Sequence, residues 1–176
     1  GTTNIDAFVD NAGTIQVDDG TINLRGGSRH SGTTEGRGVL QLASSFGETH
    51  STIGEPFWNV DRTRFSSTTL TTGGDEFVVR NRFDFEGGTI VGSNITFAGP
   101  LNWTGGTMNL GGRATVAAGS TATISSGTLN SLLINEGRIN LTGTLSGSNP
   151  ATIENTTTGT IDLQGNVGFG TFGGEA

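Results

Sequence analysis

The chain of 176 residues contains no cysteine, no tyrosine and no lysine, so all nine of its basic residues are Arg. Without Cys it forms no disulfide, iron–sulfur cluster or thiolate zinc site, a composition compatible with an exported protein. Its formal net charge is −7. This charge disfavours a nucleic-acid partner, which calls for a basic face, and it disfavours electrostatic docking on anionic lipid.

The sequence also lacks long apolar runs and clear helix signals. No apolar stretch approaches the length that spans a membrane, and no signal peptide is recognised. The chain begins at Gly1 rather than Met, and we interpret it as a mature product or as a piece of a longer repetitive protein. Its longest Ala-rich stretch, 114–124, contains Gly119 and many β-branched residues, which favours a strand.

Small and polar residues take the place of these absent types. Gly, Thr, Ser and Asn make up about half of the chain, whereas hydrophobic residues account for 31 %. Such a composition alone would be compatible with disorder. However, the aliphatic residues recur at alternate positions between turn residues, which is the period of a strand with one buried face. Stacked repeats bury small apolar residues efficiently, because each turn covers its neighbour.

A five-residue phrase recurs along the chain: glycine, any residue, an aliphatic residue, Asn or Asp, and leucine. The four copies are GTINL (20–24), GTMNL (106–110), GRINL (137–141) and GTIDL (159–163). Looser copies are GTIQV (13–17), GVLQL (38–42), GTIVG (88–92) and GTLNS (127–131). Copies follow one another at a nearly constant interval from Gly88 to Gly106 to Gly127, and again from Gly137 to Gly159.

This spacing predicts an all-β parallel β-helix, or β-solenoid, with about 20 residues per turn and eight or nine turns. An antiparallel sandwich is the alternative, but the recurrence of whole phrases favours the solenoid. Asn11, Asn135 and Asn155 precede turn glycines, where we expect turn hydrogen bonds and stacked amide ladders. No linker is recognised, so we expect a single domain, 1–176, with a less regular stretch rich in aromatic residues and Arg at 48–86.

One stretch carries a resemblance to a known family. It runs from Gly99 to Gly147 and contains WTGGTM (103–108), an Ala/Gly/Thr-rich segment and NEGRINLTG (135–143). It resembles the repeats of filamentous-haemagglutinin-like and autotransporter-like bacterial surface proteins. The resemblance covers the last half of the chain well, 13–42 moderately and 48–86 poorly. It implies a right-handed parallel β-helix in an extracellular, non-enzymatic rod.

The middle of the chain holds the candidate ligand or partner patch. Its six residues are Phe57, Trp58, Arg62, Arg64, Arg80 and Arg82. Three interpretations remain open: a larger, better-packed turn, a contact between protomers, and a patch that stacks on sugars or docks a partner. In the carbohydrate version of this hypothesis, Trp58 and the Arg residues line a groove together with Asp84 and Glu86.

The remaining candidates for chemistry are acidic pairs and the two histidines. Asp18–Asp19 and Asp75–Glu76 are adjacent, and neighbouring strand residues point to opposite faces, so they are poorly placed as catalytic pairs. His30 and His50 are separated by close to one turn of the repeat, but only two ligands are visible for a metal. We therefore expect no enzyme activity, no catalytic residues, no cofactor and no metal site.

The sequence thus favours a structural module of an extracellular bacterial rod, filament or adhesin stalk. Its expected partners are other copies of itself, stacked head to tail through open solenoid ends, or adjacent repeats of a longer chain. Surface glycans are a further possible partner, and neither nucleic acid nor membrane insertion is expected. A carbohydrate-binding or carbohydrate-active β-helix is the alternative function, and a phage fibre segment is the third.

Overall fold

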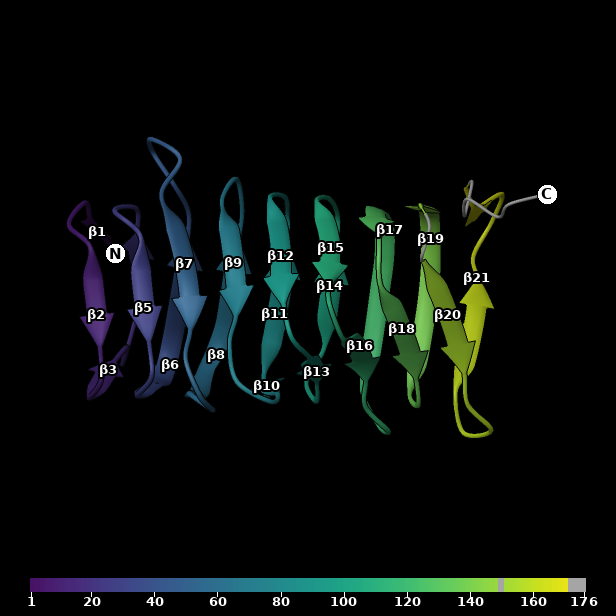
Figure 1. Ribbon diagram of the computed structural model, residues 1–176, viewed down its shortest axis with the longest axis horizontal. Helices are drawn as coiled ribbons and strands as arrows, with labels where there is room; N and C mark the ends of the chain where they lie inside the picture. The colour runs from purple at the N-terminus through teal and green to yellow at the C-terminus, as the bar shows by residue number, and fades with distance from the viewer. Residues whose placement is uncertain (149–150, 171–176) are drawn as a thin grey trace.

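The computed structural model describes residues 1–148 and 151–170. Their strands run across the long axis of a rod, from the N-terminal turns at one end to the C-terminal turns at the other (Figure 1). All pairings between named strands are parallel, and these residues contain no helix. The chain is therefore an all-β parallel β-solenoid of about eight turns, as the recurring phrases predict.

Each turn contributes strands to three stacks, here called sheets 1, 2 and 3. Sheet 1 contains β1 (Thr2–Ile5), β4 (Thr21–Leu24), β6 (Thr33–Leu42), β8 (Phe57–Phe65), β11 (Arg82–Phe85), β14 (Leu101–Trp103), β17 (Thr121–Leu129), β19 (Arg138–Gly147) and β21 (Thr160–Leu163). Sheet 2 contains β2 (Val9–Asn11), β5 (Ser28–His30), β7 (Thr49–Thr52), β9 (Thr69–Thr72), β12 (Thr89–Gly92), β15 (Thr107–Leu110) and β22 (Gly168–Phe169), with the second halves of β17 and β19. Sheet 3 contains β3 (Thr14–Gln16), β10 (Phe77–Val79), β13 (Ile95–Phe97), β16 (Arg113–Val116), β18 (Leu132–Asn135) and β20 (Thr152–Asn155), with the first halves of β6 and β8.

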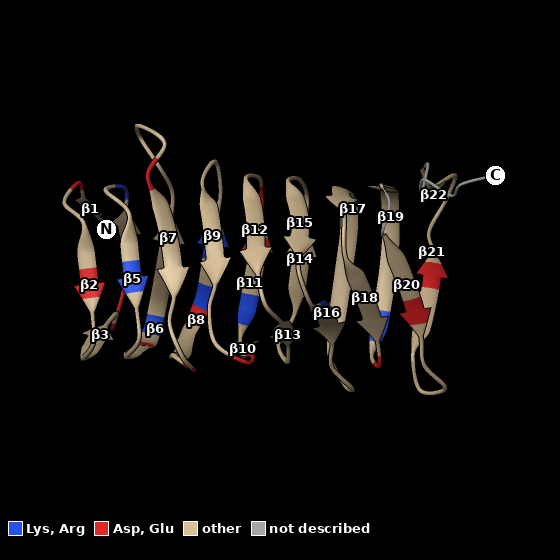
Figure 2. Cartoon of the chain, in the orientation of Figure 1, with Lys and Arg blue, Asp and Glu red and all other residues tan. Residues whose placement is uncertain are grey.

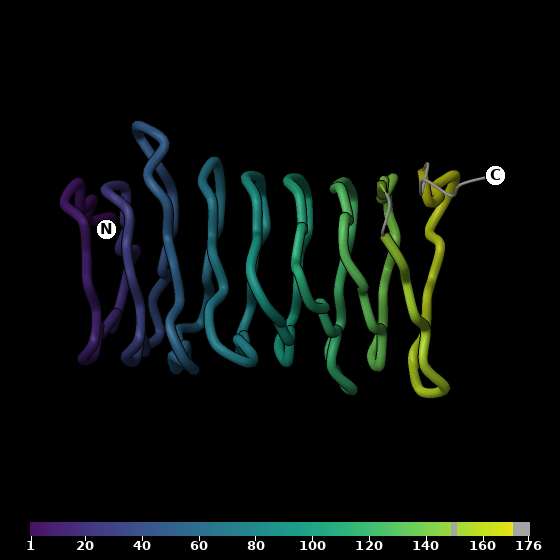
Figure 3. The backbone as a smooth tube through the Cα atoms, in the orientation of Figure 1, coloured from purple at the N-terminus to yellow at the C-terminus, as the bar shows by residue number. Residues whose placement is uncertain are grey.

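The length of a turn varies along the rod. On sheet 1, the step from Thr121 to its partner Arg138 is the shortest between paired strands. The longest step runs from Val39 to Arg62 and includes the loop 43–48, which protrudes beyond the other loops just before β7 (Figure 3). The period expected from the sequence is therefore a mean, and single insertions are accommodated in the corners between sheets.

Three of the four copies of the recurring phrase occupy equivalent positions in sheet 1. GTINL, GRINL and GTIDL place their last four residues in sheet 1, whereas GTMNL places its own in sheet 2. Turns are numbered by their sheet 1 strand, with β1 in turn 1. The closing leucines Leu24 and Leu141 share one inward column of sheet 1, and turns 3 to 7 place in this column Leu42, Phe65, Phe85, Trp103 and Ile124. An apolar residue recurs at this position because its side chain packs against the apolar side chain one turn away.

The centre of the rod holds an aromatic core. Phe85 stacks on Trp103 with 5.5 Å between ring centroids, and Phe65 lies 5.5 Å from Phe85. Phe83 and Phe97 are 5.7 Å apart. All five side chains are fully buried. Aromatic rings bury more apolar surface per residue than aliphatic side chains, so the middle turns carry the largest share of the core.

The asparagines before the turn glycines act as the sequence predicted. Asn135 Nδ2 donates to Asn155 Oδ1 at 2.7 Å and to the Thr160 carbonyl at 3.0 Å, forming an amide step between turns. Asn11 Nδ2 donates to the Thr33 carbonyl at 2.9 Å.

The stretch 48–86, which the sequence predicts to be less regular, keeps its strand pairing from turn to turn. Residues 149–150 and 171–176 of the expected single domain lie outside the described residues.

Candidate functional site

The six residues predicted as one patch occupy three different places. Arg62, Arg64 and Arg82 project outward from sheet 1, whereas Phe57 and Arg80 project outward from sheet 3. Trp58 lies inside the rod, with 2 % of its surface exposed. Its ring meets His30 edge-on at 5.2 Å and Phe77 at 4.8 Å. Trp58 is therefore a core residue, and it does not line a groove with the arginines of sheet 1.

The first cluster, on sheet 1, is built around Asp84. Phe83 and Phe85 point into the core, so strand alternation turns Asp84 outward. Arg62 Nε and Arg82 Nε both donate to its carboxylate, and the Arg82 bond measures 2.9 Å. These two side chains cover Asp84 completely, while they remain 38 % and 50 % exposed themselves. The arrangement joins turns 4 and 5 through a shared, desolvated carboxylate.

Arg64 forms the neighbouring pair across the same two turns. Its Nε and Nη2 donate to the two carboxylate oxygens of Glu86 at 3.0 and 2.9 Å, a bidentate geometry. This hydrogen bonding raises the pKa of Arg64 above its usual value. Sheet 1 therefore gathers three guanidinium groups and two carboxylates as closed ion pairs.

Similar ion pairs recur elsewhere on the rod. Arg25 pairs with Asp6 at 2.6 Å, and Arg138 pairs with Asp162 at 2.6 Å, each across one turn. Arg29 and Asp10 form another pair between β5 and β2, where opposite charges lie on adjacent strands (Figure 2). Arg62 and Arg64 therefore link neighbouring turns in the same way, whereas Arg82 pairs with Asp84 within its own strand. Arg82 also lines a hollow of about 310 Å³ on sheet 1, together with Pro100, Leu101, Asn102, Thr121 and Thr123.

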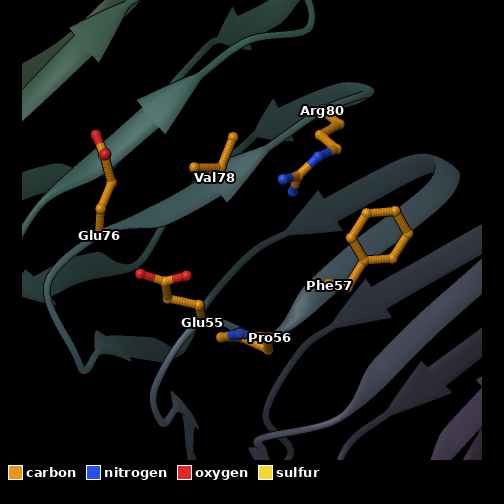
Figure 4. Close-up of a pocket in the computed structure, with 6 residues that line it drawn as sticks. All are labelled: Glu55, Pro56, Phe57, Glu76, Val78 and Arg80. Atoms are coloured by element: carbon orange, nitrogen blue, oxygen red, sulfur yellow. The ribbon is translucent and has the colours of Figure 1, made fainter.

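The second cluster, on sheet 3, surrounds a hollow of about 350 Å³. Arg80 lies over the Phe57 ring, with its Cζ 4.8 Å from the ring centroid. The carboxylates of Glu55 and Glu76 lie at the other end of the hollow, beyond Val78 (Figure 4). Thr96 Oγ1 donates to Glu76 Oε1 at 2.5 Å, which fixes this carboxylate. The hollow combines an aromatic ring, a hydrogen-bond donor and two acceptors.

Sequence reasoning placed Phe57 and Arg80 in the patch, considered Glu76 only as a member of the adjacent pair Asp75–Glu76, and did not name Glu55. The separation of the two glutamates in the sequence is close to one turn of the solenoid. Applying the turn length to charged residues as well as to glycines would have placed them on neighbouring turns. Of the adjacent acidic pairs, Asp18–Asp19 contributes to a turn, where Gly20 N donates to Asp19 Oδ1 at 2.8 Å, whereas Glu76 of the pair Asp75–Glu76 lines the hollow.

The two histidines belong to a buried hydrogen-bonded chain within sheet 2. Strand pairing sets His50 beside Ser28 rather than beside His30, because this turn is longer than the separation of the two histidines in the sequence. Ser28 Oγ lies 2.6 Å from His50 Nδ1 and 2.8 Å from His30 Nε2. His50 Nε2 lies 3.0 Å from the Ala43 carbonyl. The histidines therefore meet through a serine.

The hydrogen-bond acceptors around the two histidines determine which ring nitrogen of each carries the proton. A carbonyl only accepts, so His50 Nε2 carries a proton and donates to Ala43, which leaves His50 Nδ1 to accept from the Ser28 hydroxyl. Ser28 then accepts from His30 Nε2, and His30 Nδ1 is left buried without a partner. Burial lowers the pKa of His30 to about 4 and also lowers the pKa of His50.

This serine–histidine arrangement has no access to a substrate. Ser28 is 1 % exposed and both histidines are fully buried. Within residues 1–148 and 151–170, no group of three or more His, Cys, Asp or Glu side chains is placed to hold a metal ion. The chain of hydrogen bonds is consequently a feature of the core that links β5 to β7 and to the loop 43–48.

Comparison with known protein families, with curated proteins and with solved structures gave no match. The class of this protein therefore follows from its own structure, which is an all-β parallel β-solenoid. In the described part of the chain, no helix is long and apolar enough to cross a membrane.

Proposed function

We propose that this chain is a non-enzymatic structural module of an extracellular bacterial rod, filament or adhesin stalk. The module assembles head to tail through its solenoid ends, with other copies of itself or with adjacent repeats of a longer chain. Its fold, the ion pairs between turns and the resemblance of 99–147 to bacterial surface repeats support this function. The Cys-free composition is compatible with an extracellular location.

The observation that carries the proposal is the N-terminal turn. Among the described residues, β1, β2 and β3 each pair with a strand on one side only, namely β4, β5 and β6. Most of β1 is exposed, and Phe8 in the same turn is 61 % exposed. Unpaired strand edges present free N–H and C=O groups, which favour the addition of another strand.

The last described turn offers a matching surface on sheet 1. Within residues 151–170, β21 pairs only with β19, and Leu163 is 53 % exposed. A second copy placed in repeat register sets Ile5 of its β1 beside Leu163, extending the inward column of sheet 1. This contact joins unlike ends, so it does not close and produces a fibre.

Negative-stain micrographs and sedimentation of the purified chain test this function. We expect fibres with a diameter of one solenoid, and Ile5→Lys should prevent them by placing a charge in the end contact. Ile53→Lys is the matched control, because Ile53 is 46 % exposed on turn 3, away from both ends of the rod. Circular dichroism would show that both variants keep their strands.

A mixing experiment makes the test sharper. Because the proposed contact joins unlike ends, an Ile5→Lys copy retains one competent end. A small fraction of this variant should therefore cap and shorten wild-type fibres, whereas Ile53→Lys should not. Single rods of one length at every concentration would contradict head-to-tail stacking of copies. Trimeric rods would instead favour the phage fibre hypothesis.

A further inference from the structure

We propose that the hollow on sheet 3 is a binding subsite for one neutral sugar residue of a glycan. Its lining is Glu55, Pro56, Phe57, Glu76, Val78 and Arg80 (Figure 4). This site lies on the side of the rod, on turns 3 and 4, and it does not depend on how the ends of the rod assemble.

The polar groups of the hollow match hydroxyl chemistry. Each sugar hydroxyl both donates and accepts hydrogen bonds. The Glu55 and Glu76 carboxylates only accept, and the Arg80 guanidinium only donates. Figure 4 shows the two carboxylates at one end of the hollow and Arg80 at the other. A ring that carries hydroxyls around its rim can therefore donate on one side and accept on the other.

The same arrangement disfavours charged ligands. A cation attracted by Glu55 and Glu76 meets the positive charge of Arg80, while an anion attracted by Arg80 meets two carboxylates. Like charges placed close together in a contact cost binding free energy, which makes them a specificity device. The two signs of charge therefore select a neutral ligand with many hydroxyls over an ammonium compound or a carboxylate.

Apolar groups form the rest of the lining. Phe57 is 40 % exposed although Arg80 lies over its ring, so part of this aromatic surface stays available. Pro56 and Val78 extend the apolar strip. A pyranose ring has a face of C–H groups, and contact with an aromatic ring removes apolar area from water on both sides. The polar and apolar groups of the hollow thus match the two kinds of surface on a sugar.

The site is also held in place before any ligand binds. The Phe57 ring is fixed by Arg80, and the Glu76 carboxylate is fixed by Thr96. Phe57 and Val78 belong to the paired strands β8 and β10, and the other lining residues lie in the segments that directly flank these strands. Side chains that are already ordered lose little conformational freedom on binding. The volume of about 350 Å³ lies at the lower end of small-molecule pockets, which fits one or two rings.

Saturation-transfer NMR and calorimetry on the whole chain test this inference. The probes are the methyl glycosides of glucose, galactose, mannose and N-acetylglucosamine, with glucuronate and glucosamine as charged counterparts. We expect at least one neutral glycoside to bind, and glucuronate and glucosamine to bind at least about tenfold more weakly. Phe57→Ala and Glu76→Gln should each weaken the neutral probe by about tenfold.

The matched control is Phe46→Ala, because Phe46 is 92 % exposed on the loop 43–48, away from the hollow. It should leave binding unchanged. Binding that survives Phe57→Ala in a correctly folded variant would overturn the site, and if that variant fails to fold, Glu76→Gln decides. Binding of none of the neutral probes, or tighter binding of glucosamine or glucuronate, would overturn the ligand class. None of these results changes the interpretation of fibres, which is tested separately by electron microscopy.

Discussion

At the scale of single residues, the least expected feature is the buried chain that links His30, Ser28 and His50. Three successive hydrogen bonds satisfy all of its polar atoms except His30 Nδ1. Protonating either imidazole requires a charge in an apolar interior, which explains the lowered pKa values of both groups. The folded core therefore stabilises the neutral form of both His30 and His50.

We predict that the chain loses stability in mild acid. The pKa of His30 is about 4 in the folded state and about 6.5 when unfolded. The unfolded chain binds more protons between these values, so the free energy of unfolding falls as pH drops from 6.5 to 4. The His30 contribution is at most about 3 kcal/mol. Chemical denaturation at several pH values measures this slope.

His30→Met is the variant for this experiment, because it replaces the titratable imidazole with an apolar side chain of similar size beside Trp58. It should flatten the dependence between pH 6.5 and 4.5 and leave only the His50 contribution. Asp10, Glu48 and Asp162 also have lowered pKa values, but their stabilisation is lost mainly below pH 4.5. An unchanged slope in His30→Met would show that other groups control the acid response.

The two carboxylates of the sheet 1 cluster should differ in their contribution to stability. Asp84 is fully buried beneath two guanidinium groups, so Asp84→Asn leaves both arginines without their anion and should cost about 1–3 kcal/mol. Glu86 is 30 % exposed, and Glu86→Gln should cost less than about 1 kcal/mol. Urea denaturation of the two variants compares them directly. Equal losses would mean that burial of Asp84 has no energetic consequence.

At the scale of strands and turns, the sequence predicts the positions of strands and the length of a turn better than it predicts where single side chains point. Gly88, Gly106 and Gly127 precede three sheet 2 strand segments that stack on consecutive turns, so the distances between them are true turn lengths. The phrase identifies a strand because its glycine permits the bend before the strand, and its closing aliphatic residue packs in the core. These are local requirements, and they can be read from short segments.

The composition of the sheet 1 cluster and of the hollow depends on strand register between turns, which short segments of sequence do not show. Phe57 and Trp58 are adjacent in the sequence, yet one lines the hollow and the other lies in the core. Strand alternation explains their separation, but the direction of each residue is set by register across turns of unequal length. The insertion at 43–48 shifts that register locally, which the sequence alone did not reveal. The prediction for 48–86 therefore grouped the buried Trp58 with surface residues that lie on two different sheets.

Close contact between turns predicts which glycines resist substitution. Gly92 and Gly119 both have positive φ, 117° and 81°. A Cβ on Gly92 would lie 2.0 Å from the Thr72 carbonyl oxygen, whereas a Cβ on Gly119 meets nothing within 4 Å. Gly119→Ala should therefore cost only the backbone penalty of about 1–2 kcal/mol. Gly92→Ala should cost clearly more, because the backbone of a neighbouring turn must move.

Thermal unfolding monitored by circular dichroism measures this difference. Gly119→Ala reports the penalty of a positive φ with open space around the Cβ, whereas Gly92→Ala adds close contact with the Thr72 carbonyl to a dihedral penalty of its own. If Gly119→Ala proved as destabilising as Gly92→Ala, backbone strain alone would account for both losses. Close packing of turns would then not be the reason for glycine at position 92.

At the scale of the whole molecule, the rod is a one-dimensional stack in which each turn contacts its neighbours. Stability is then a sum of turn and interface contributions, so different turns can open with different free energies. Phe65, Phe83, Phe85, Phe97 and Trp103 concentrate the aromatic packing in the middle of the stack. The first turn has exposed strands, and its Ile5 and Val9 are only partly buried.

We predict that amide hydrogen exchange is slowest in the middle turns and fastest in the first turn. In dilute solution, peptides from 57–103 should be the best protected and peptides from 1–16 the least. Raising the protein concentration until fibres form should add protection at the two ends, in 1–16 and in β21, because stacking pairs the open strand edges of both ends. Protection that rises evenly along the chain would indicate lateral association. Strong protection of 1–16 in dilute solution would show that its strand edges do not open independently, against the prediction that stability varies along the rod.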